Sequence, residues 1–272
     1  MSSNALPGDV TTLVDQIRAL GGTLDDDLTA TLDAIEAVNN WRPPTPTDIA
    51  SVVYNGGLTA ATADEVLTEA MNQPTINGHD LRVKAKAALV DQFTRQVAGP
   101  GGDHIIESVR PAFTKSCAAM AEAADLVSPT DRVDVLSDAD DDTITAWRTI
   151  GEHRVTLDQV SALVRVLVER FEVLGGPQPW HGHRWIDAAM YTPGVEHLTN
   201  VGRALSTPSG AGGPRGGRWH AISSAIRLNT VTEARAILAD AHQQHREAEA
   251  AAYAATHGTL TDGNGQRPRA AV

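Results

Sequence analysis

Apolar residues at helical spacing, interrupted repeatedly by Gly, Pro or Asn, are the feature that most constrains the fold of this chain. A first apolar stripe ends at Gly21-Gly22, and a second begins after Thr23, with Asp26 three residues on as a near capping box. Spacing of i, i+3, i+4 is typical of a helix that buries one face. The pattern predicts a helical hairpin, whose two stripes are Val10, Leu13, Val14, Ile17 and Leu20, then Leu24, Leu28, Thr31, Ile35 and Val38.

The same pattern continues through the chain and predicts a mainly α fold. Three prolines in residues 41–48 predict an extended connector, and capping boxes predict helix starts at Thr62 and Thr156. Longer helices are expected from about Asp80 to Ala98 and from Asp103 onwards. Only the stretch that begins with Val133 suggests a short strand or turn. We therefore expect a multi-helix bundle of helical hairpins with a long C-terminal helix and a disordered tail.

Changes in composition along the chain predict five regions. A stretch of Gly, Pro and Ser separates two helical parts, and the last residues are polar without periodicity. The regions are an N-terminal helical domain (1–128), a second helical region with the central core helix (129–205), a Gly-rich loop or linker (206–218), a C-terminal helix (219–257) with a break near Asn229-Thr230, and a disordered tail (258–272).

The charge balance limits the classes of partner. The chain has 34 acidic and 22 basic residues and a formal net charge of −12. This excess of acid favours solubility and argues against binding nucleic acid or an anionic membrane over the whole surface. Nucleic acid remains an option only through a local basic region. Protein partners or self-association are the expected contacts.

Cysteine usage and the absence of targeting signals indicate a soluble protein of a reducing compartment. Cys117 cannot form an intramolecular disulfide, and its alanine neighbours predict a buried, inert thiol. The first residues lack the basic and apolar regions of a signal peptide, and no stretch reaches the roughly 18 apolar residues of a membrane span. The expected location is the cytoplasm of the producing cell, or a virion.

The acidic run Ser137–Thr143 is the first candidate for metal chemistry. An EF-hand loop that starts at Asp138 would need Gly at its sixth position and Glu at its twelfth, where this chain has Thr143 and Thr149. The motif therefore fails, and the acids are expected to stabilise the N-terminus of the following helix.

The segment Trp180–Asp187 leaves two interpretations open. His181, His183 and Asp187 could provide the two-His, one-carboxylate ligands of a metal-dependent, hydrolase-like enzyme. The alternative, which we favour because no HExxH or Cys pair supports a metal, is a Trp/His cluster of an interface or the core. A second His pair, His242 and His245 with Glu249, is expected on a solvated helix face.

Residues 203–227 hold four arginines and no acid, which is unusual in this acidic chain. The glycines around Arg215 suggest either a plain flexible loop or a loop that reaches the phosphates of a nucleic acid or an acidic partner surface. No P-loop or GxGxxG motif is present. No catalytic residue, metal site or cofactor is predicted. The predicted interface consists of Trp180, His181, His183, Arg184, Trp185, Arg215, Arg218 and Trp219.

The whole chain is acidic, helical, and poor in Lys and aromatic residues, with a Gly-rich loop and a polar tail. In this overall texture it loosely resembles structural or assembly proteins of actinobacterial phages. The resemblance rests on texture and on no family motif, so it transfers no site residue. It implies a non-enzymatic protein that works by contact, packing in a virion or serving its assembly.

Overall fold

The computed structural model confirms the mainly α fold. It describes residues 5–42, 49–72, 78–128, 130–131, 133–175, 186–208, 213 and 215–257, and within them every regular element is a helix. The predicted tail 258–272 lies outside these residues. The α-helices are α1 Pro7–Ala19, α2 Asp26–Asn40, α3 Ile49–Tyr54, α4 Ala63–Asn72, α5 Gly78–Val97, α6 Pro100–Leu126, α7 Asp141–Glu169, α8 Leu198–Leu205 and α9 Val231–His257. Short 3₁₀ helices are η1 Val133–Asp138, η2 Asp187–Met190, η3 Val195–His197 and η4 Gly217–Ala221.

The turn between α1 and α2 needs both of its glycines, for different reasons. Gly21 has a positive φ of 72°, a backbone conformation that side chains disfavour. At Gly22 an added Cβ would lie 2.7 Å from both Ser108 Oγ and Val109 Cγ1 on α6. The second helix is capped by Asp25, whose carboxylate accepts from the Leu28 amide at 2.8 Å, rather than by the predicted Thr23.

Helix α7 is longer than predicted. The expected new helix start at Thr156 is wrong, because α7 runs without interruption from Asp141 to Glu169. The Thr156 hydroxyl donates to the Glu152 carbonyl at 3.3 Å, a bond typical of a helix interior. The acidic run does begin this helix, as predicted: Asp140 accepts from the Thr143 amide at 2.8 Å. Hydrogen bonds from the side chain and the backbone amide of Thr143 lower the pKa of Asp140.

The C-terminal helix starts at Val231 and not at Trp219. Trp219 belongs to the 3₁₀ turn η4, and an irregular stretch follows it. The break predicted near Asn229-Thr230 is therefore the true boundary of the helix. Of the short strand or turn predicted from Val133, the structure has the turn, which is the 3₁₀ helix η1.

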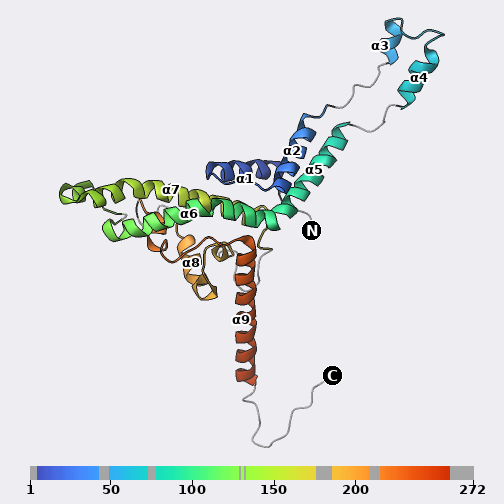
Figure 1. Cartoon of the computed structure of the whole chain (residues 1–272). Coiled ribbons are helices and arrows are strands. Elements are labelled where there is room, and N and C mark those ends of the chain that lie inside the picture. The colour runs from blue at the N-terminus through green and yellow to red at the C-terminus, as the bar shows by residue number, and fades with distance from the viewer. Residues whose placement is uncertain are drawn as a thin grey trace, which may run out of the picture.

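Helices α6 and α7 form the centre of the molecule and lie side by side (Figure 1). One hydrophobic core joins them to α1, the inner end of α5, α8 and the first turns of α9. The predicted regions 1–128 and 129–205 therefore pack on each other. As predicted, the apolar side chains of residues 157–174 lie at the heart of this core. The buried ones are Leu157, Val160, Leu163, Val164, Leu167, Phe171, Val173 and Leu174.

Two parts of the fold project from this centre (Figure 1). The antiparallel pair α2 and α5 forms an arm, beyond whose outer end α3 and α4 lie. Helix α9 extends away from the centre on its own. The α6/α7 hairpin ends on the side of the molecule opposite to the arm.

Candidate interaction site

A partly buried polar cluster joins the end of the Gly-rich loop to α7. The Trp219 indole N–H donates to Asp158 Oδ1 at 2.8 Å, and the same carboxylate lies 3.4 Å from Arg154 Nε. Arg218 donates from Nη2 to Ser161 Oγ at 2.9 Å and from Nη1 to the carbonyl of Leu205. We call Arg154, Asp158, Ser161, Arg218 and Trp219 the Asp158 cluster.

Burial governs the electrostatics around this cluster. The Arg218 side chain is only 7% exposed, and desolvation lowers its pKa although Asp158 opposes the shift. Burial also raises the pKa of Asp187, and the positive charges of Arg165 and Arg218 only partly offset this. Arg218 holds internal structure through its charge-assisted hydrogen bonds to Ser161 and Leu205.

Arginine side chains also hold the described parts of the Gly-rich loop against α7 and the segment before η1. The Arg215 guanidinium carbon lies 3.3 Å from the centre of the Trp147 ring, in a cation–π contact. Arg215 Nη1 donates to the Asp131 carbonyl at 3.4 Å, and Arg154 Nη1 donates to the Gly213 carbonyl at 3.4 Å. Residues 209–212 and 214 lie outside the described residues.

These contacts bear on the predicted interface. Trp180, His181, His183, Arg184 and Trp185 lie outside the described residues. Arg215, Arg218 and Trp219 are described, and their contacts are with this same chain. Trp219 is fully buried, so it acts as a core residue in this fold. An interface over the eight residues stays a prediction, and Arg218 and Trp219 would have to be uncovered to join it.

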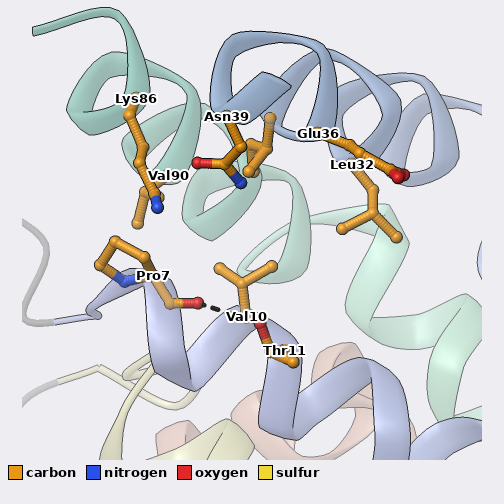
Figure 2. A pocket seen from close by; sticks show the side chains of 9 residues that line it. Pro7, Val10, Thr11, Leu32, Glu36, Asn39, Lys86 and Val90 are labelled. Atoms are coloured by element: carbon orange, nitrogen blue, oxygen red, sulfur yellow. Dashed lines mark hydrogen bonds between the residues drawn. The ribbon is translucent and has the colours of Figure 1, made fainter. Parts of the chain in front are cut away.

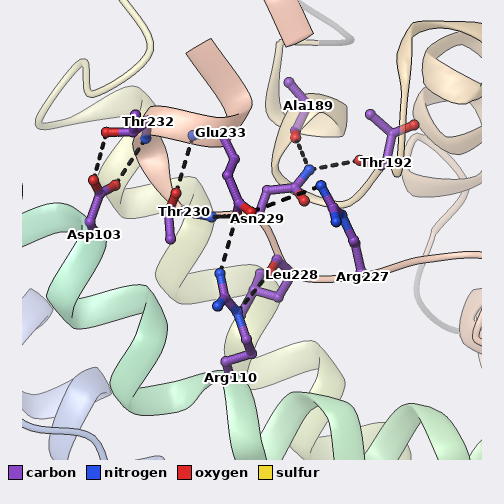
Figure 3. Close-up of polar contacts among 10 residues, drawn as sticks. All are labelled: Asp103, Arg110, Ala189, Thr192, Arg227, Leu228, Asn229, Thr230, Thr232 and Glu233. Atoms are coloured by element: carbon purple, nitrogen blue, oxygen red, sulfur yellow. Dashed lines mark hydrogen bonds and ion pairs between the residues drawn. The ribbon is translucent and has the colours of Figure 1, made fainter. Parts of the chain in front are cut away.

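The base of α9 holds a second polar network that the sequence analysis missed (Figure 3). Thr230 and Glu233 form a reciprocal capping box: the Thr230 amide donates to Glu233 Oε2 at 2.8 Å, and the Glu233 amide donates to Thr230 Oγ1 at 3.1 Å. Asp103 on α6 accepts from both the amide and the hydroxyl of Thr232, at 2.9 and 2.6 Å. The T-x-x-E spacing of this box was a signal available in the sequence.

Three further side chains attach this base to the rest of the fold. Arg110 on α6 donates to Glu233 Oε2 at 3.2 Å and to the Leu228 carbonyl at 3.1 Å. Arg235 donates to the carbonyls of Val173 and Ala98, both at 2.7 Å. The buried amide of Asn229 donates to the carbonyls of Ala189 and Thr192, also at 2.7 Å. The direction of α9 is therefore set by hydrogen bonds to α6, η2 and the loop after α7.

The two halves of α9 differ in how far they are buried. Its first turns bury Val231, Ala234, Leu238 and Ala241, whereas every residue from Gln243 to Thr256 is exposed. Polar pairs run along this outer half, such as His245 Nε2 with Glu249 Oε1 at 3.3 Å, as predicted for a solvated helix face. The outer half of α9 is thus a helix held out from the molecule by its base.

The described residues offer little for catalysis. They hold no group of three or more His, Cys, Asp or Glu side chains placed to bind a metal ion. The metal alternative depends on His181 and His183, outside the described residues, so it remains untested. Cys117 is buried as predicted, and burial raises the pKa of its thiol to about 12.

Two cavities formed by the described residues are lined mainly by groups that do not pair as nucleophile and base. Figure 2 shows a pocket of about 120 Å³ between α1, α2 and α5, with Glu36 and Lys86 on its wall and mostly apolar residues around them. This is smaller than the roughly 300 Å³ at which ligand pockets begin. A groove of about 370 Å³ between α1 and α7 is lined by Thr12, Asp15, Gln16, Ala19, Gln159 and Ala162, with no nucleophile–base pair.

No family model, curated protein or solved structure matches this chain. Within the part of the chain that the structure describes, no helix is both long and apolar enough to cross a membrane.

Proposed function

We propose that this protein is a non-enzymatic structural or interaction protein that works through helical contacts, and that it serves as a component of a phage virion or of its assembly. The observation that supports contact as its function is the contrast within α9. Its base is fixed by a capping box and by Asp103, Arg110 and Arg235, while its outer half is exposed from Gln243 to Thr256.

An isolated helix of this length is only marginally stable in water. Fixing its base to the rest of the protein holds the helix in place, and this is useful if the outer half binds a partner. The outer half is rich in Ala and Glu, which favour the helical state before any partner is bound. A helix formed in advance loses less conformational entropy on binding. The phage assignment itself rests on the texture of the sequence.

The test uses Ala251→Pro in the full-length chain, with Ala251→Ser as the matched control. Proline inside a helix costs about 3 kcal/mol locally. Because residue 251 is exposed and far from the core, we expect the free energy of unfolding of the protein, measured in urea, to change by less than about 0.5 kcal/mol. Co-expression with the products of neighbouring genes should give a complex that Ala251→Ser retains and Ala251→Pro loses.

Two results would overturn this proposal. Equal binding by both variants would show that α9 is not the contact. One equivalent of zinc or iron in protein purified without chelator, lost when His181 and His183 are changed to Ala, would favour the metal-dependent enzyme instead.

A further inference from the structure

The outer end of the α2/α5 arm is both apolar and basic. Trp41, Leu81 and Val83 are 37%, 48% and 52% exposed there. Residues 78–86 also carry Arg82, Lys84 and Lys86 against one acid, Asp80, and Arg42 follows Trp41. Two of the three lysines of the chain are thus in this short segment. We call this surface, Trp41, Arg42 and residues 81–86, the basic end.

The far end of the α6/α7 hairpin has the opposite charge. Residues 121–142 hold eight acids and one base, Arg132, which lies outside the described residues. Leu126 and Val133 are 46% and 66% exposed in the same stretch. We call the surface of Glu122, Asp125, Leu126, Val133, Asp138, Asp141 and Asp142 the acidic end. Figure 1 shows that it lies on the opposite side of the molecule from the arm.

The charges decide how two copies can meet. Copies of a chain with net charge −12 repel one another in general, so a contact between them needs a local pairing of unlike charge. A two-fold contact that joins two basic ends, or two acidic ends, would place like charges together. A basic end against an acidic end pairs unlike charges and also covers the exposed apolar side chains of both surfaces.

We propose that this chain associates head to tail, with the basic end of one copy docked on the acidic end of a second copy. The two ends lie on opposite sides of one molecule, so each bound copy still offers a free end, and the contact repeats into a ring or a filament. This inference rests on the proposed function as a contact protein, and it names the partner as a second copy of the chain.

The test compares full-length variants by sedimentation velocity over a range of concentrations. Arg82→Glu with Lys84→Glu and Lys86→Glu changes the charge of the basic end from +4 to −2. Glu122→Lys with Asp125→Lys, Asp138→Lys and Asp142→Lys changes the charge of the acidic end from −5 to +3. Wild type should form larger species as its concentration rises and lose them in about 1 M salt, where the Debye length is about 3 Å. Each reversed variant should associate at least ~10-fold more weakly.

Mixing the two reversed variants distinguishes charge pairing from loss of folding. Each variant alone brings like charges together, but in the mixture every basic surface again meets an acidic one, so association should return. The control Arg18→Glu with Lys115→Glu and Arg203→Glu makes the same charge change as the first variant on exposed residues of α1, α6 and α8, and it should associate like wild type. Circular dichroism should show the same helix content in all variants.

A wild-type protein that stays monomeric at every concentration would overturn head-to-tail association. So would oligomers that neither reversal weakens, or a mixture that does not associate. None of these outcomes decides the proposed function, which depends on binding of a different protein by α9 and on the Ala251→Pro variant.

Discussion

At the scale of single residues, Trp219 connects the core to a partly buried carboxylate, that of Asp158. Its ring lies 6.2 Å from that of Tyr191, and its N–H satisfies one oxygen of Asp158. The indole therefore contributes apolar burial and a hydrogen bond at one position, and the two contributions can be separated by substitution.

We expect Trp219→Ala to lower the free energy of unfolding by about 3 to 5 kcal/mol, because it leaves a large cavity. Trp219→Phe should cost about 1 to 2 kcal/mol, since it keeps most of the apolar contact but removes the donor to Asp158. Urea unfolding followed by circular dichroism measures both. A cost below about 1 kcal/mol for the alanine variant would mean that Trp219 is not a core residue.

Cys117 should be unreactive in the folded protein, because burial holds its pKa at about 12 and the thiolate is the reactive form. We expect a thiol reagent at pH 8 to label it only after unfolding in urea. The folded state retains the proton more tightly than the unfolded state. Its contribution to stability is therefore complete below the unfolded pKa of about 8.5 and is lost as pH rises towards 12. Rapid labelling of native protein would contradict this.

At the scale of elements, the start of α9 depends on Glu233, which accepts from the Thr230 amide and from Arg110. We expect Glu233→Ala to cost about 1 to 2 kcal/mol of stability. Glu233→Gln should cost roughly half of that. The reason is that the amide oxygen can still cap the helix, while the partly exposed ion pair is lost. Chemical denaturation provides the measurement.

Glu247→Ala is the matched control, because Glu247 pairs with Gln243 in the exposed half of α9. Its effect on unfolding should stay within about 0.5 kcal/mol. Equal losses for Glu233→Ala and Glu247→Ala would show that the base of α9 has no special part in holding the helix.

At the scale of the whole molecule, burial is concentrated in the centre and is sparse in both projections. Hydrogen exchange should therefore be slowest in α6 and α7, where Ile105, Ile106, Ile150 and Leu163 are completely buried. Amides of α9 beyond Gln243, and those of α3 and α4, should exchange much faster in dilute protein. Strong protection of the outer half of α9 in a dilute, monomeric sample would contradict this distribution of stability.

The sequence by itself determined the helical class and most helix positions, because helical periodicity and caps are local properties that neighbouring residues impose. The hairpin of α1 and α2, the acidic start of α7 and the buried Cys117 could all be predicted in this way. The tertiary structure decided the rest. Trp219 points into the core, where Asp158, sixty-one residues away in the chain, accepts its N–H. Thr156 lies inside α7, where its hydroxyl donates to the Glu152 carbonyl and does not cap a new helix. The network at the base of α9 joins Asp103 and Arg110 to residues more than a hundred positions away, and no local pattern carries the information for such contacts.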